Sequence, residues 1–167
     1  MKSLNDSVKE YTAQLRKGHI QKAYRGIIAL MSALKKQLEG KYPEFKAGTL
    51  YLGYMDMTYF AFTPDELLKR SLKVAIVYLH EQNRFEVWLS GVNRKIQAEY
   101  IEIFRHTNIG DSRLSQAAPG VDSIVELEII SNPDFDEPEY LMKTIENKSI
   151  EFAKSILSTL DNQERTP

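Results

Sequence analysis

The stretch at positions 72–93, LKVAIVYLHEQNRFEVWLSGVN, constrains the fold more than any other part of the chain. Apolar side chains recur there at every second position in two runs, first Val74, Ile76 and Tyr78 and then Phe85, Val87 and Leu89. That period is typical of strands that bury one face. Because the polar pair Gln82 and Asn83 separates the runs, we expect an antiparallel hairpin with its apolar face in the core.

A two-residue turn at positions 82–83 fixes the register of this hairpin. Three pairs then lie opposite each other on the core face: Ile76 and Leu89, Tyr78 and Val87, His80 and Phe85. The other face mixes apolar side chains with charged ones, including Glu86 near Trp88. We therefore expect that face to be only half covered.

Two helical patterns precede the hairpin. Apolar residues recur in steps of three and four, at Leu4, Val8, Tyr11 and Leu15 and again at Ile20, Tyr24, Ile27, Met31, Leu34 and Leu38. Gly18 separates the two segments, and Pro43 follows the second, where a helix would break. We expect a helical hairpin at about 4–39 whose apolar seam belongs to the core. A surface for a partner helix is the alternative.

The segment 49–62, TLYLGYMDMTYFAF, is rich in strand-forming residues and apolar at both alternating sets of positions. It predicts a long strand covered on both faces and bent at Gly53. Asp56 is the exception, because an unpaired buried carboxylate is costly. A structural Asp56 that accepts backbone or tyrosine hydrogen bonds is the simpler interpretation, and a binding or catalytic site is the other.

Two further helix starts carry clear capping signals. The Thr-Pro-Asp-Glu sequence at 63–66 predicts a short helix through Lys69. Asn93 is suited to cap a helix at about 94–104, which places Arg94 and Lys95 in the first turn. Cations there oppose the helix dipole unless an anion binds nearby, but the cost at an exposed end is only ~0.3 to 1 kcal/mol. The simpler interpretation is therefore that these two cations lie at the surface without binding an anion.

The remaining segments complete an α+β pattern. Positions 106–120 show no periodicity and form a long connection, either functional or disordered. Positions 121–131 predict a fourth strand, and 132–139, NPDFDEPE, an acidic turn. Helical spacing then follows, with a break near 147–149. We expect a four-stranded, largely antiparallel sheet covered by the N-terminal helical hairpin and the later helices.

Composition limits the organisation of the chain and its setting. With 167 residues and 43% apolar content, the chain is most simply one α+β domain over 1–167, with the sheet and later helices at about 49–161. The absence of cysteine excludes disulfides and thiolate chemistry. No apolar run approaches the ~20 residues that span a bilayer, so we expect a cytoplasmic protein that does not bind membranes.

Charge is unevenly distributed along the sequence although the formal net charge is −1. Positions 2–46 hold ten Lys or Arg against four Asp or Glu, whereas positions 122–151 hold two against nine. Either the basic segment forms a surface for an acidic partner, or the two segments simply lie near each other in the fold, which is the simpler interpretation. We do not expect nucleic acid to be the partner.

No phosphate-binding loop, nucleophile elbow or histidine-rich metal spacing is present, and we expect no cofactor and no bound metal. The order helix, strand, strand, strand, helix, strand is that of restriction-endonuclease-like nucleases. Those enzymes need a lysine near their acidic metal ligands, and Trp88 stands in its place. A metal-dependent nuclease-like enzyme or hydrolase using Asp56 with Glu86 is nonetheless the alternative function.

Four stretches, YMDMTYFAFTP, LKVAIVYLHEQNRFEVWLSGVNRKIQ, GVDSI and NPDF, resemble a family of small bacterial proteins of unknown function. The resemblance covers most of the chain. It implies a stand-alone cytoplasmic domain and assigns no catalytic or binding residue.

The leading hypothesis is therefore a non-enzymatic cytoplasmic binding or interaction domain. Its partner is an unknown small molecule or protein, and a homodimer is compatible with the sequence. The candidate binding residues are Asp56 and a group flanking one partly open sheet face, Glu86, Trp88, Arg94 and Lys95.

Overall fold

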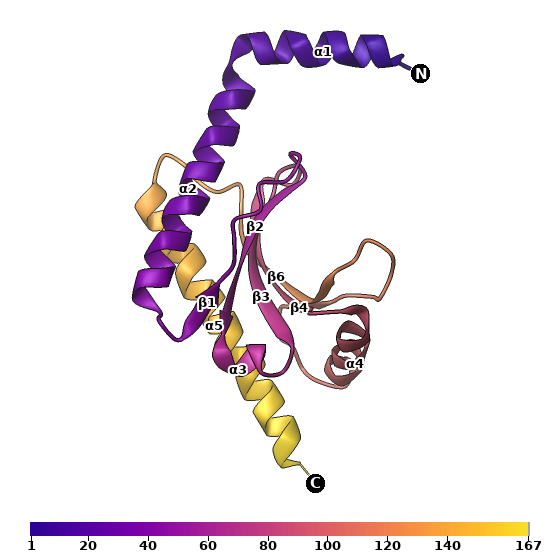
Figure 1. Cartoon of the computed structure of the whole chain (residues 1–167), viewed down its shortest axis with the longest axis vertical. Coiled ribbons are helices and arrows are strands. Elements are labelled where there is room, and N and C mark those ends of the chain that lie inside the picture. Colours follow the sequence, from indigo (N-terminus) through magenta and orange to yellow (C-terminus); the bar gives the residue numbers. More distant parts are fainter. Residues whose placement is uncertain (167) are drawn as a thin grey trace.

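A computed structural model describes residues 1–166 and shows a six-stranded antiparallel sheet with helices on both sides (Figure 1). The helices are α1 (Leu4–Lys17), α2 (His19–Lys41), α3 (Asp65–Leu68), α4 (Arg94–Arg105) and α5 (Pro138–Arg165). The strands are β1 (Phe45–Ala47), β2 (Met57–Pro64), β3 (Leu72–Leu79), β4 (Arg84–Gly91), β5 (Arg113–Leu114) and β6 (Ser123–Ser131). Their order in the sheet is β1-β2-β3-β4-β6-β5.

The α+β class and the antiparallel sheet are confirmed, but the expected number of four strands was wrong. The two additional strands, β1 and β5, are three and two residues long. They lie at opposite edges of the sheet, where each pairs with a longer neighbour. Strands this short contain too few alternations for a hydrophobic period to be visible in the sequence.

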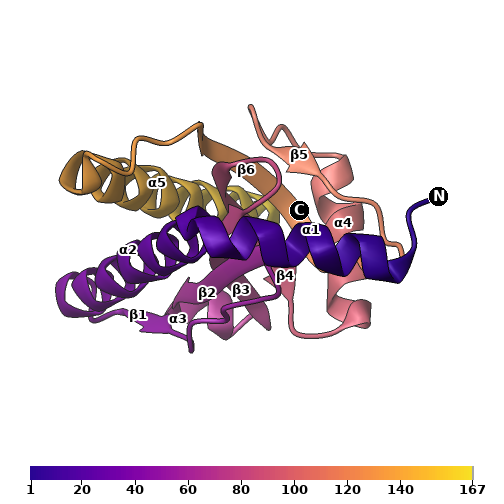
Figure 2. The same cartoon turned by 90° about the horizontal axis from the view of Figure 1, so that it is seen from above.

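Two long helices cover one face of the sheet. Figure 1 and Figure 2 show α2 and α5 side by side on that face, with α4 on the far side of the sheet. Alternate residues of the central strands point into this layer, and Phe60, Ile76, Val87 and Leu89 are fully buried there. Burying such side chains contributes roughly 1.5–3 kcal/mol each, so this layer supplies most of the fold's hydrophobic stabilisation.

The hairpin of β3 and β4 is confirmed, but its register differs from the expected one by two residues. Tyr78 lies opposite Phe85, and Ile76 lies opposite Val87. The reason is a connection of four residues, 80–83, in which Asn83 adopts a left-handed backbone with φ of 47°. A shift of two preserves the alternation, so the same side chains still face the core.

The segment preceding β2 departs from the expected strand at 49–62. The strand begins at Met57, and the preceding residues fold back in a tight turn that leaves one bridge between Tyr51 and Tyr59. Gly53 has φ of 74°, and a Cβ there would lie 2.0 Å from the carbonyl oxygen of Met57. Glycine is therefore required at this position, where the chain reverses rather than bends.

Helix α5 is continuous, and the expected break near 147–149 is absent from its described length, Pro138–Arg165. Contacts with the rest of the molecule hold this stretch in place. Glu146 accepts hydrogen bonds from Lys41, the last residue of α2, and from Tyr42, which follows it, and the Lys148 ammonium donates to the carbonyl of Ile129 at 2.6 Å. These anchors offset the modest helix propensity of Asn147 and Ser149 beside them.

Helix α1 extends away from the body of the molecule as an arm (Figure 1). Its start is fixed by a capping box between Ser3 and Asp6, and it ends at Gly18, whose φ of 79° turns the chain into α2. The two helices expected at about 4–39 are therefore present, but the expected hairpin with its apolar seam in the core is wrong for α1. The helices meet nearly at a corner (Figure 1), because Gly18 turns the chain, and no residue of α1 is buried.

In the part of the chain that the structure describes, no helix is both long enough and apolar enough to cross a bilayer.

Candidate functional site

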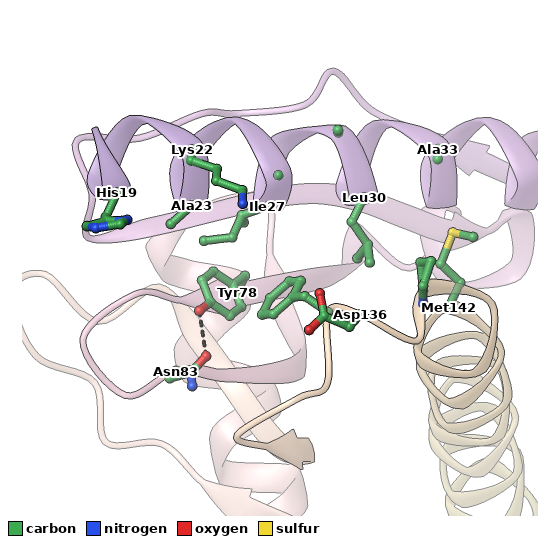
Figure 3. Close-up of a pocket in the computed structure, with 14 residues that line it drawn as sticks. His19, Lys22, Ala23, Ile27, Leu30, Ala33, Tyr78, Asn83, Asp136 and Met142 are labelled. Carbon is green, nitrogen blue, oxygen red and sulfur yellow. Dashed lines mark hydrogen bonds between the residues drawn. The ribbon is translucent and has the colours of Figure 1, made fainter. Parts of the chain in front are cut away.

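A groove of about 730 Å³ lies alongside α2, from His19 to Ala33. Four separate segments line it: α2, the connection between β3 and β4, the connection between β6 and α5, and the first turns of α5 (Figure 3). Its volume is within the range of roughly 300–1,000 Å³ that is usual for ligand sites.

The α2 wall of the groove is made of small and aliphatic side chains. Ala23, Gly26, Leu30 and Ala33 follow one another in steps of three or four, and Ile27 lies four positions after Ala23, so all five share one side of the helix. A Cβ placed on Gly26 would have no atom within 4 Å, so the groove is open at this point. Small residues of this kind let another backbone approach α2 closely.

The opposite wall is aromatic. Tyr78 and Phe135 meet edge to face with ring centroids 5.8 Å apart, and Met142 lies further along the groove (Figure 3). The Tyr78 hydroxyl donates a 2.7 Å hydrogen bond to Oδ1 of Asn83. Burial raises the pKa of Tyr78, so its hydroxyl stays protonated and keeps this bond at neutral pH. The wall is therefore both apolar and preorganised.

The ends of the groove carry polar and charged side chains. His19 and Lys22 lie at the end near the start of α2, and Asp136 lies beyond the aromatic wall (Figure 3). Asp136 belongs to the acidic turn, which we define as Asp134, Asp136, Glu137 and Glu139. All four of these side chains are exposed. A ligand for this groove would be largely apolar, with polar or charged groups at its ends.

The comparisons with known proteins give one match. A family model described as a domain of unknown function, DUF7000, matches residues 4–160. The chain belongs to this family. Neither the comparison with curated proteins nor the one with solved structures gives a match. The resemblance to a family of unknown function is thereby confirmed for almost the whole chain, including the arm.

Two of the residues singled out in the sequence of this DUF7000 domain, Glu86 and Trp88, lie together on the sheet face opposite α2. Glu86 is fully buried. Its carboxylate forms ion pairs with Arg84 at 2.6 Å and Arg113 at 3.0 Å, and it accepts a 2.8 Å hydrogen bond from Nε1 of Trp88. Two arginines and an indole surround the carboxylate, and their charges and hydrogen bonds to Oε1 explain how it is tolerated inside the sheet. Glu86 Oε2 and Arg84 Nε are close enough for an ion pair but are not aligned for a hydrogen bond.

Asp56 lies apart from that cluster. It is exposed in the turn before β2, where its side chain accepts a 2.9 Å hydrogen bond from the backbone N–H of Tyr54. Hydrogen bonds from the Tyr54 and Met57 backbone lower the pKa of the Asp56 carboxyl. Strand β3 separates β2 from β4, so Asp56 does not converge with Glu86. Across residues 1–166, no three His, Asp or Glu side chains form a group that would hold a metal ion.

Arg94 lines a smaller hollow of about 360 Å³ at the start of α4, on the same sheet face as Glu86. Its guanidinium pairs with Asp122 at 3.3 Å and donates to Oε1 of Gln97 and to the carbonyl of Val121. These partners already pair with the Arg94 guanidinium, which the sequence suggested could bind an anion. Lys95 is exposed and lies outside the lining of that hollow.

Sequence reasoning missed the groove because its lining is apolar and comes from distant segments. The stripe along α2 was interpreted as core, and its members Ile27, Met31 and Leu34 are indeed buried. The adjacent Ala23, Gly26 and Ala33 are exposed. The available signal was this run of small residues beside a stripe of large ones, which is typical of a helix side that another backbone approaches.

Proposed function

We propose that this DUF7000 domain is a non-enzymatic binding module whose groove receives an apolar helical segment of a protein. The observation that carries the proposal is the open groove of about 730 Å³, with small residues on the α2 wall and aromatic ones opposite. An amphipathic helix binds such grooves by inserting side chains spaced three, four and seven positions apart. In this proposal the domain works in the bacterial cytoplasm, a setting that the family resemblance and the cysteine-free sequence suit.

The carboxylates offer less support for an enzyme. Glu86 is neutralised by two arginines, and Asp56 lies apart from it in the turn before β2. The surface around Trp88 is also less suited to a ligand than the groove, because its polar groups are already paired with one another. Binding through the groove accounts for an apolar surface that the fold itself leaves uncovered.

A fluorescent probe with an apolar ring system and an anionic group, 1-anilinonaphthalene-8-sulfonate, tests the proposal. We expect saturable binding to the wild-type chain at low protein concentration. Gly26→Leu should weaken that binding by about tenfold or more, because the new side chain fills the groove. Gly40→Leu is the matched control, since Gly40 also lies in α2 and also has open space around it. Equal probe affinity in the wild type and the Gly26→Leu variant would contradict the proposal.

A further inference from the structure

We infer that the segment filling the groove is helix α1 of a second copy of this chain, so that two chains exchange their N-terminal arms. The inference rests on the proposed function of the groove and adds the identity of the occupant. Three observations support it: the exposed apolar side of α1, the hydrogen bonds at Gly18 that fix the direction of α1, and the complementary charges of α1 and the groove edge.

The arm has an apolar side that its own chain leaves uncovered. None of the residues 4–17, all of them described, is buried. Leu4, Val8 and Tyr11 share one side of the helix, and they are 79%, 50% and 60% exposed. Three large apolar side chains in a row along a well-capped helix are the pattern of a helix that binds in a groove.

The joint at Gly18 keeps the arm out of the groove of its own chain. The Gly18 N–H donates to the carbonyl of Leu15, and Nε2 of Gln21 donates to the same carbonyl at 2.8 Å. These bonds fix the arm across the end of the molecule, whereas the groove runs alongside α2 (Figure 2, Figure 3). A second copy can supply the arm without any change at the joint.

The charges of the arm and of the groove edge are complementary. Lys9 and Arg16 each follow an apolar position of the arm and so lie about 100° around the helix from it. The acidic turn beside Phe135 carries four carboxylates and has no ion pair among the described residues. An arm lying in the groove brings its basic edge toward this turn, which favours the second copy over a neutral or acidic helix.

In a dimer with twofold symmetry, the arm and the groove of each chain are both buried. Each chain gives one arm and receives one, so the area buried by a single helix is doubled without a new surface. The turn before β2 lies at the same end of the molecule as α1 (Figure 1) and presents further exposed apolar side chains. These are Tyr51, Leu52, Tyr54 and Met55. They add apolar area where the two chains would meet, as a stable dimer requires.

Sedimentation equilibrium and light scattering on the full-length chain test the inference. We expect the wild type to have twice the chain mass of 19.2 kDa. Val8→Glu places a charge in the apolar side of the arm, and Gly26→Leu fills the groove; each should raise the dimer dissociation constant by about 100-fold or more. Ala13→Glu, on the opposite side of the arm, and Gly40→Leu are the controls that should remain dimeric.

The probe separates failure of this inference from failure of the proposed function. In a dimer with exchanged arms, Val8→Glu should increase probe binding, because the groove is vacated. A wild-type chain that is monomeric at all concentrations but binds the probe in the groove would overturn the second copy as occupant and leave the groove function standing. A dimer that persists in both the Val8→Glu and Gly26→Leu variants would overturn the inference as well.

Discussion

Helices α1 and α5 have the same spacing of apolar residues but differ in how much of that apolar side is buried. Both carry apolar residues in steps of three and four, yet α5 buries nine residues and α1, over its described length, buries none. Helix α5 is also tied to Lys41 of α2 by Glu146 and to β6 by Lys148, whereas the side-chain hydrogen bond between α1 and α2 lies at the corner where they meet. Hydrophobic periodicity thus shows that a helix side will be covered, and leaves open which chain covers it.

The sharpest test of this contrast is a matched pair of leucine truncations. Leu141→Ala removes a side chain that is 1% exposed, and Leu4→Ala removes one that is 79% exposed. We expect the first to lower the free energy of unfolding by about 2–5 kcal/mol and the second to change it by less than about 0.5 kcal/mol. Urea denaturation at low protein concentration measures both. Similar losses in the two variants would show that α1 is part of the folded body of a single chain.

The polar anchor of α5 provides the second test. Burial disfavours ionisation of Glu146, but the hydrogen bonds from Lys41 and Tyr42 and the charge of Lys41 outweigh it and lower the pKa of the carboxyl. A lowered pKa in the folded state means that this contribution to stability is complete above the usual glutamate value of 4.5 and is lost as pH falls through the folded value. We expect Glu146→Gln to cost about 1–2 kcal/mol near neutral pH.

That difference between wild type and Glu146→Gln should shrink as the pH falls below about 4.5. Thermal unfolding followed by circular dichroism across this range measures it. Glu151→Gln is a control on the exposed side of α5. If Glu146→Gln were equally destabilising at pH 3 and pH 7, the anchor would not depend on the charge of the carboxylate.

The joint of the arm gives the smallest expected effect on stability. Gly18 has φ of 79°, so Gly18→Ala should cost about 1 kcal/mol, because a side chain is disfavoured in that conformation. Gly40→Ala, in an ordinary helical conformation, should instead stabilise the chain by about 0.5–1 kcal/mol. Calorimetric unfolding of both variants checks the sign. A neutral Gly18→Ala variant would mean that the corner between α1 and α2 is not held at this residue.

The sequence predicted which side chains of the central hairpin face the core, because an alternating pattern survives a shift of register by two. It did not predict the register itself, which depends on the left-handed backbone of Asn83. It also missed the contacts of His80, whose backbone N–H donates to the Asp56 carbonyl and whose ring Nε2 lies 2.8 Å from the hydroxyl of Thr58. Such contacts arise between segments far apart in the chain.

The candidate site was harder to predict than the fold. Sequence reasoning selects charged and aromatic residues that look out of place, and Glu86 and Arg94 prove to be held by neighbours that no sequence pattern reveals. The groove is lined by apolar residues such as Ala23, Leu30 and Phe135, which show no distinctive sequence pattern. They form a groove only when folding brings four segments together. The sequence showed the apolar spacing of α1, but it did not show that the chain's own fold leaves this side exposed.

Cross-linking between two different single-cysteine chains tests the exchange of arms most directly, since the protein has no cysteine of its own. A chain carrying Val8→Cys is mixed with a chain carrying Gly26→Cys and treated with a short bismaleimide. We predict a covalent pair containing one chain of each kind, and none when Ala13→Cys replaces Val8→Cys. Equal cross-linking from Ala13→Cys, or no mixed pair with Val8→Cys, would contradict an arm seated in the groove of a second copy.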